Sequence, residues 1–242
     1  MKLIMENWRS YTNEQKYESS KVTTAAIVWN NPNFRPFDKK ILSNLPKYGI
    51  PGFLKNVPQG HSGVILVSED PKRNQVNCIS IDFGADDNFC SKEHKKKFLY
   101  SLKRKLGIFV GGRVKSRSFR ISGENIVSNL SQNLPEIIQK WKKISRSSHT
   151  PQEFGISYDI DVNRAMSFVR SKKGCSEYTV IPDLAGSGGD NCGSFSLKVV
   201  AHGLGKDGEA EELIGSMIGP DGMIQKMQDI EWIETGMSLD YS

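Results

Sequence analysis

The sequence of 242 residues contains only four cysteines, and no two of them have the C-x-x-C spacing that is typical of a zinc site. Four cysteines are also few for a disulfide framework in a chain of this length. They are Cys78, Cys90, Cys175 and Cys192. We therefore expect free thiols in a reducing compartment, with no bound metal and no other cofactor.

Long apolar runs are missing as well. No stretch approaches the roughly 20 apolar residues of a membrane span. The first residues carry Glu6 too early, and their apolar run is too short, for a signal peptide. We expect a chain that is cytoplasmic as synthesised and has no transmembrane segment. The glycine-rich stretch at 186–193 is not followed by Gly-Lys-Ser/Thr and lacks Rossmann spacing, which argues against nucleotide binding.

Positive charge exceeds negative charge, with 33 Lys and Arg against 27 Asp and Glu and a net charge of +6. This balance favours acidic partners without selecting among them. The segment 91–107 has helical spacing and many lysines, which either contact a polyanion or, as we favour, form a solvated helix face. The residues for a weak polyanion contact are Lys95, Lys96, Lys97, Lys103 and Arg104. A second basic patch is indicated by Arg113, Lys115 and Arg117, which share one side of a predicted strand.

Hydrophobic patterning predicts an α+β fold, an antiparallel sheet with helices packed on it. Two β-branched runs, 61–69 and 75–84, flank a turn that opens with Asp-Pro, and they predict a hairpin. Residues 19–60 show little periodicity and are interpreted as extended chain and loop. Other predicted strands are 112–122, 153–161 and 178–182, and predicted helices are 124–145 (interrupted or restarted near Pro135), 162–172 and one beginning at Cys192. Two weak helices are expected within 206–242.

Cys192 stands at the start of its predicted helix, where Asp190 or Asn191 can act as the cap. At that position the helix dipole and the unpaired N–H groups favour a thiolate and could also hold an oxyanion. Gly189 and Gly193 leave room for a substrate to approach the backbone. Taken alone, a small buried thiol on a helix is the simpler interpretation of Cys192.

A thiol nucleophile needs a base, usually histidine. The chain has four histidines. His94 and His149 lie in polar segments and are expected to be solvated, while His202 is about 15 Å along the same helix as Cys192. His61 opens the first strand of the hairpin, where a sheet end could face a helix N-terminus. It is therefore the candidate base for Cys192.

The hairpin supplies a third candidate. If its turn is centred near Lys72 and Arg73, Asp82 approaches the His61 ring and can fix its tautomer. A slip of one residue would turn Asp82 to the other face of the sheet, in which case Ser80 is the alternative.

The motifs GHSGVILV, ISIDFG and EYTVIPDLAGSGGDNCGSFSLKVV occur in that order. Over roughly 58–205 the chain resembles the circularly permuted papain-like cysteine hydrolases of the NlpC superfamily, in the lecithin:retinol acyltransferase-like group. In that group the histidine strand precedes the cysteine helix. The resemblance implies Cys192 as nucleophile and His61 as base, with Asp82 at the polar position of the second strand. Asn191 matches the residue before the nucleophile.

The resemblance also implies an organisation and a function. Residues 1–57 would be a leader and extended segment, 58–205 a permuted papain-like domain with a basic helical insertion at about 91–107, and 206–242 a helical extension. A hydrolase of the peptidase or amidase type would cleave an amide or related acyl bond in a peptide, peptidoglycan or acyl substrate, with Asn191, Gly189 and Gly193 supporting the oxyanion. The alternative is a catalytically inactive papain-like binding or structural protein, for example a phage virion component.

Overall fold

The computed structural model describes residues 23–32, 60–70, 73–86, 109–145, 150–172, 174, 176–179, 189–215, 223–234 and 236–238. Several predictions lie outside these residues: the leader before residue 23, the basic segment 91–107, and most of the glycine-rich loop. So do Cys90, Cys175, His94 and His149.

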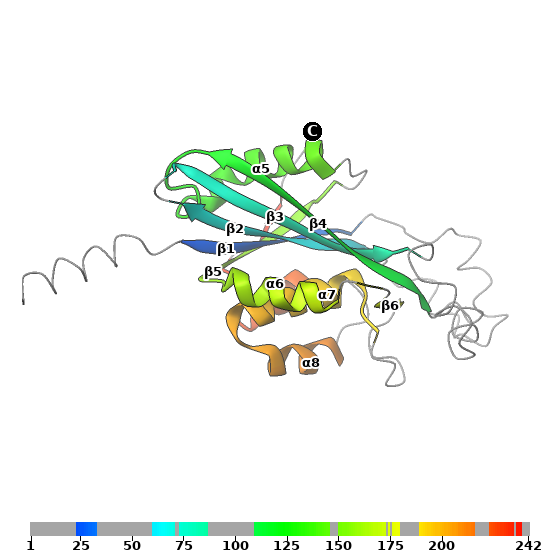
Figure 1. Cartoon of the computed structure of the whole chain (residues 1–242). Helices are drawn as coiled ribbons and strands as arrows, with labels where there is room; N and C mark the ends of the chain where they lie inside the picture. Colours follow the sequence, from blue (N-terminus) through cyan, green and yellow to red (C-terminus); the bar gives the residue numbers. More distant parts are fainter. Residues whose placement is uncertain are drawn as a thin grey trace, which may run out of the picture.

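The described strands form one antiparallel sheet of seven, in the order β6-β4-β3-β2-β1-β5-β7 (Figure 1). The strands are β1 Thr24–Asn31, β2 His61–Asp70, β3 Gln75–Ala85, β4 Phe109–Ser122, β5 Glu153–Tyr158, β6 Ser176–Thr179 and β7 Gly236–Ser238. The described helices are α5 Leu130–Ser145, α6 Val162–Ser171, α7 Cys192–Leu204, α8 Asp207–Gly215 and α9 Met223–Asp229. The predicted α+β class and the predicted antiparallel sheet are confirmed.

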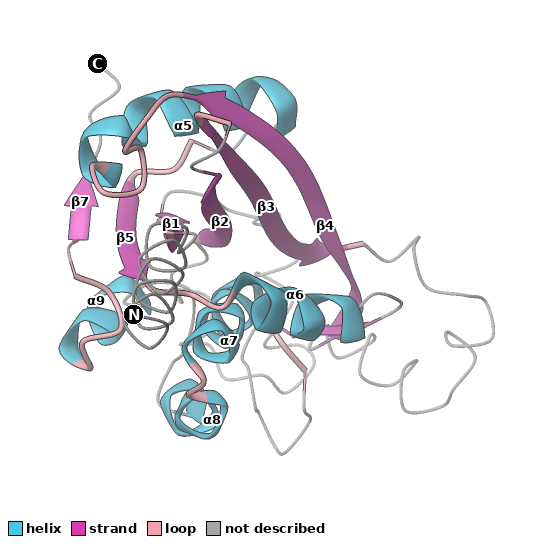
Figure 2. Ribbon diagram, turned by 60° about the vertical axis from the view of Figure 1, so that its left-hand side comes forward, coloured by secondary structure: helices cyan, strands magenta, loops and turns pink. Residues whose placement is uncertain are grey.

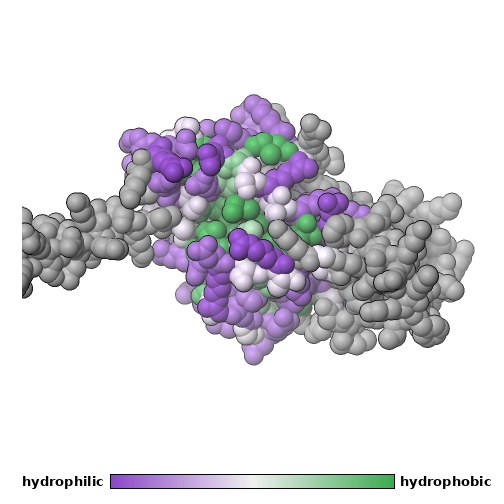
Figure 3. Space-filling model, viewed as in Figure 1, coloured by the Kyte–Doolittle hydropathy of each residue, from purple (hydrophilic) through white to green (hydrophobic). Residues whose placement is uncertain are grey.

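Helices cover both faces of this sheet. Figure 1 shows α5 on one face and α6, α7 and α8 on the other, and Figure 2 shows the same arrangement from the side. Alternate residues of β1, β2 and β3 accordingly enter one of two apolar clusters. Val64 and Ile81 pack in the α7 cluster, whereas Ile65 and Cys78 pack in the α5 cluster. The described surface in view in Figure 3 is mainly hydrophilic, with smaller apolar areas.

The predicted hairpin is present. β2 pairs with β3 in a register that sets Gly63 opposite Asp82 and Asp70 opposite Gln75. The chain reverses through Asn74, which has a φ of 45°, a conformation that asparagine tolerates better than most residues. Hence the turn lies close to the position that the sequence predicts.

Residues 19–60 are not all loop, because β1 lies within them. β1 is a central strand, paired with β2 on one side and β5 on the other. Its run Ala-Ala-Ile-Val-Trp is buried on both faces of the sheet. A strand buried on both faces lacks the apolar-polar alternation on which the sequence analysis relied.

Pro135 neither interrupts nor restarts a helix. It lies inside α5, which begins at Leu130 and runs without a break to Ser145. The missing N–H lies near the start of the helix, and the apolar face continues past it to Trp141. Packing of that face therefore outweighs the lost hydrogen bond.

The other predicted elements are present with different bounds: the helix predicted over 124–145 begins at Leu130, the strand predicted over 153–161 ends at Tyr158, and the strand predicted over 178–182 overlaps β6. Asp161 caps α6, and its side chain accepts a hydrogen bond from the backbone N–H of Arg164 at 2.9 Å. Residues 206–242 contain the two expected short helices, α8 and α9, together with β7. No helix among the described residues is long and apolar enough to cross a membrane.

Candidate active site

Cys192 is the first residue of α7. Asn191 is the N-cap: its side chain accepts from the N–H of Ser194 at 2.8 Å, while the Ser194 hydroxyl accepts from the N–H of Asn191 at 3.0 Å. Ten of the 13 residues of α7 are buried, Cys192 completely. This reciprocal cap fixes the first turn and with it the position of the thiol.

His61 and Asp82 are joined by a hydrogen bond, with 2.8 Å between Nε2 and Oδ1. Because Gly63 lies directly opposite Asp82, His61 is a diagonal neighbour of Asp82 on the same face of the sheet. Ser80, the alternative partner, instead donates to the backbone carbonyl of Arg117 at 3.3 Å. The structure therefore brings Asp82, and not Ser80, to the His61 ring.

The His61 ring also interacts with Cys192, through a hydrogen bond and through charge. Burial opposes the charged form of both groups. For His61 the charges of Cys192 and Asp82 outweigh burial and raise its pKa to about 10. For Cys192 the charge and hydrogen bond of His61, together with a hydrogen bond from the backbone of Ser62, outweigh burial and lower its pKa. Together these shifts favour a thiolate and an imidazolium over two neutral groups.

These three side chains meet at one end of the sheet. Asp82 projects on the α5 face, as Cys78 does, whereas α7 packs on the opposite face. His61 is the first residue of β2 and touches both Asp82 and Cys192. His61, at the end of β2, therefore contacts Asp82 from the α5 face and Cys192 from the α7 face of the sheet.

Tyr178 is a residue that the sequence analysis did not assign to the site. Its hydroxyl donates to Cys192 Sγ at 3.9 Å. A bridge between Tyr178 and Asp190 holds β6 beside the start of α7. Burial, followed by the charges of Cys192 and Asp82, raises the pKa of Tyr178 well above its usual value. The phenol therefore remains a hydrogen-bond donor.

Trp29 is the second residue that the sequence analysis missed. Its ring meets His61 edge to face at 5.5 Å between centroids, and it also packs against Trp141 of α5 at 5.1 Å. Trp29 comes from β1, directly opposite Gly63. The aromatic contact covers one side of the His61 ring, and only 7% of the His61 side chain is exposed.

The residues predicted to support an oxyanion have different roles. The Asn191 side chain caps α7, and Gly189 is buried just before the cap. Cys192 and Gly193 occupy the first turn, whose N–H groups have no carbonyl partner within the helix. This backbone, with the Tyr178 hydroxyl beside it, is the part of the site suited to a negative oxygen.

An ionic cluster centred on the buried Asp190 carboxylate lies behind the cap. Asp190 accepts from the Ser194 hydroxyl at 3.2 Å and pairs with Lys198 at 2.9 Å and Lys172 at 3.8 Å. Lys198 also pairs with Glu211 of α8 at 3.1 Å. Burial opposes the charge of Lys198, but Asp190 and Glu211 outweigh it and raise its pKa. The cluster ties the start of α7 to α6 and α8.

His202 lies near the far end of α7, as the sequence predicts. Its Nδ1 is 2.7 Å from Asp207 Oδ1, and its ring stacks on Phe168 at 4.3 Å. His202 therefore does not serve Cys192. Among the described residues, no three His, Cys, Asp or Glu side chains are grouped so that they could hold a metal ion.

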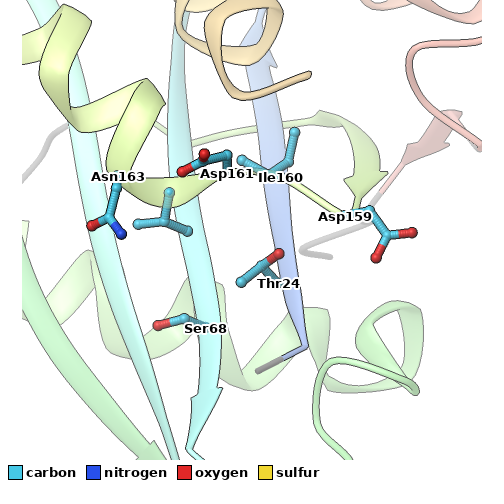
Figure 4. Close-up of a pocket in the computed structure, with 7 residues that line it drawn as sticks. Thr24, Ser68, Asp159, Ile160, Asp161 and Asn163 are labelled. Carbon is cyan, nitrogen blue, oxygen red and sulfur yellow. The ribbon is translucent and has the colours of Figure 1, made fainter. Parts of the chain in front are cut away.

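A pocket of about 530 Å³ lies elsewhere, lined among others by Thr24, Ser68, Asp159 and Asp161 (Figure 4). Thr24 and Ser68 pair at one end of the β1–β2 ladder, and His61 stands at the other end. The pocket is thus separate from the Cys192 site. Comparisons of the chain with protein-family models, curated proteins and solved structures found no match.

Proposed function

We propose that the chain is a cysteine hydrolase of the peptidase or amidase type, with Cys192 as nucleophile, His61 as its acid-base partner and Asp82 as the group that orients His61. The observation that carries the proposal is the contact of His61 with both Cys192 and Asp82. In this arrangement the pKa of His61 is raised and the pKa of Cys192 is lowered. The order of the elements, a histidine strand before a cysteine helix packed on it, supports the resemblance to permuted papain-like hydrolases.

The first chemical step follows from this arrangement. The Cys192 thiolate attacks the substrate carbonyl carbon, a C–S bond forms, and the carbonyl oxygen takes the negative charge. The backbone N–H groups at the start of α7 and the Tyr178 hydroxyl stabilise that oxygen. When the bond to the leaving group breaks, the His61 imidazolium gives it a proton. A thioester on Cys192 remains.

Water completes the cycle. Neutral His61 takes a proton from a water molecule, which attacks the thioester carbonyl. The C–S bond breaks, the acid product leaves, and the thiolate and imidazolium are restored. Throughout, the Asp82 carboxylate holds the ring through Nε2 and leaves the other ring nitrogen for Cys192.

A second candidate is a papain-like binding or structural protein without turnover. The observation that favours it is the complete burial of Cys192, whose sulfur accepts a hydrogen bond from Tyr178. A substrate must displace that contact before the thiolate can react. The two candidates therefore differ in whether Cys192 forms an acyl adduct.

The decisive experiment treats the full chain with a thiol-directed acyl probe and maps the adduct by mass spectrometry. The hydrolase predicts rapid acylation of Cys192, slow release of the acyl group by water, and no adduct in Cys192→Ala. Cys78 provides the internal control, since it is free and buried. Equal, slow labelling of both thiols would support the binding protein.

A further inference from the structure

β4 carries a row of exposed cations close to the Cys192 site. The row consists of three exposed residues at alternate positions of the strand, Arg113, Lys115 and Arg117. They lie on the face of β4 that, closer to Ser122, packs against α5. Lys115 lies directly opposite Asp82. The row is therefore one strand from Asp82 and two strands, about 10 Å, from His61.

The acids beside this row are fewer than its cations, although Asp82 lies directly opposite Lys115. Arg113 has a partner in Asp86, at 3.6 Å, and Arg117 donates to the backbone carbonyl of Ile144. Within the described ranges, no acidic side chain forms an ion pair with Lys115. The neighbouring end of α5 adds further lysines, and its last turn contains Lys142 and Lys143. The surface therefore favours an anionic ligand.

The outer edge of β4 is open over the same residues. β6 pairs with β4 only from Phe109 to Gly112. In the part of the chain that the structure describes, no strand pairs with that edge from Arg113 to Ser122. Figure 2 shows β4 running along the outside of the sheet. An extended peptide can add to such an edge through backbone hydrogen bonds.

We propose that this edge binds an extended acidic segment of the substrate polypeptide as an added strand. In an added strand, side chains on one face recur about every 6.6 to 6.8 Å, which matches the spacing of alternate residues along the row Arg113, Lys115 and Arg117. Carboxylates at alternate positions of the bound segment therefore face the row. The proposal rests on the proposed function, because it treats the bound polypeptide as the substrate. Nucleic acid fits less well, because the row offers no aromatic side chain on which bases could stack.

The test measures binding without turnover, using full-length Cys192→Ala and a fluorescent ten-residue peptide that has glutamate at alternate positions. Fluorescence anisotropy should show saturable binding that weakens as NaCl is raised. The same peptide with glutamine in place of glutamate should bind at least about fivefold more weakly. Lys115→Gln combined with Arg117→Gln should weaken binding of the acidic peptide about fivefold as well.

Arg120→Gln is the matched control, because Arg120 is exposed on the same strand but on the opposite face. It should change binding by less than about twofold. Because Arg117 also contacts α5, Lys115→Gln alone must give part of the loss with an unchanged melting temperature. Equal binding of the two peptides, or an equal loss in Arg120→Gln, would overturn the proposal.

Two other outcomes would also overturn it. A single-stranded oligonucleotide that binds more tightly than the peptide through the same residues would assign the row to nucleic acid. Aggregation of the Lys115→Gln variant with unchanged peptide binding would show that the row only protects an open edge. Failure of Cys192 acylation in the wild-type chain, with peptide binding intact, would reject the hydrolase and leave the docking edge in place.

Discussion

Cys78 and Cys192 are both fully buried, yet their ionisation is shifted in opposite directions. Cys78 lies in the α5 cluster, where burial raises its pKa to about 12 and Lys140 offsets only part of the effect. Cys192 lies at the start of α7, where His61 and Ser62 outweigh burial and lower its pKa. Burial alone therefore does not decide whether a thiol is reactive. What differs is the charged His61 ring and the backbone hydrogen bond from Ser62, both of which reach Cys192 and not Cys78.

The largest expected effect is the difference between the two thiols in the wild-type chain. At pH 6, Cys192 should react with iodoacetamide at least about a thousandfold faster than Cys78, because only the thiolate is the nucleophile. Peptide mapping after timed alkylation measures both rates in one sample. Comparable rates in the folded chain would contradict the assigned ion pair.

The pKa shifts of Cys192 and His61 set the pH range in which Cys192 should react faster than Cys78. Because the pKa of Cys192 is lowered, its thiolate, and the stability that the thiolate contributes, are lost as the pH falls through that value. Because the pKa of His61 is raised, its contribution is complete below its unfolded value and is lost as the pH rises through about 10. The ion pair is therefore present between these two values.

Replacing His61 should remove most of the difference. In His61→Asn the ring charge is gone, so alkylation of Cys192 at pH 6 should fall about a hundredfold or more, and turnover about a thousandfold. His202→Asn is the matched control, because His202 also pairs with an acid and stacks on an aromatic ring, but at the far end of α7. A similar loss in both variants would show that helix stability, and not the site, is being measured.

Replacing Asp82 should have a smaller effect. Asp82→Asn removes one of the two charges that raise the pKa of His61, so that pKa should fall and alkylation of Cys192 at pH 6 should slow about tenfold. Titration of His61 by NMR measures the pKa directly. Asp86→Asn is the control, because Asp86 is an acid next to the end of β3 that pairs with Arg113. It should leave the pKa of His61 and the alkylation rate of Cys192 unchanged. An unchanged His61 pKa in Asp82→Asn would exclude the orienting role.

Removing the cap of α7 should have the smallest effect. Asn191→Ala should cost about 1 kcal/mol in the free energy of unfolding and slow Cys192 alkylation only a few-fold. Asp161→Ala removes the corresponding cap of α6 and should cost a similar amount without changing the alkylation rate. Denaturant unfolding and alkylation of both variants provide the comparison. If Cys192 were alkylated at the same rate in Asn191→Ala and Asp161→Ala, the cap of α7 would not position the thiol.

The sequence predicted those parts of the site that depend on local signals. The β2–β3 hairpin has two β-branched runs and a clear turn, so its pairing could be inferred, whereas the choice between Asp82 and Ser80 needed the register that the structure supplies. With only four histidines, elimination was enough to single out His61 for Cys192. The catalytic roles of these residues remain predictions.

The contacts of Trp29 and Tyr178 could not be predicted in the same way. Trp29 reaches His61 because β1 is inserted between β2 and β5, and a strand that is buried on both faces has no alternating pattern. Tyr178 reaches Cys192 through a single bridge between β6 and Asp190. Both contacts depend on packing between segments that are distant in the chain, and this packing leaves no local pattern in the sequence.

Gly63 places a strict limit on how this sequence can vary. A Cβ at this position would lie 2.6 Å from Cζ2 of Trp29 and 2.9 Å from the backbone carbonyl oxygen of Ile81. Even alanine would push the indole away from His61 or separate β2 from β3, which carries Asp82. Surface positions of α5 can exchange many residues at little cost. At Gly63, a single added methyl group changes the surroundings of His61 through Trp29 and Ile81, the residues that it would meet first.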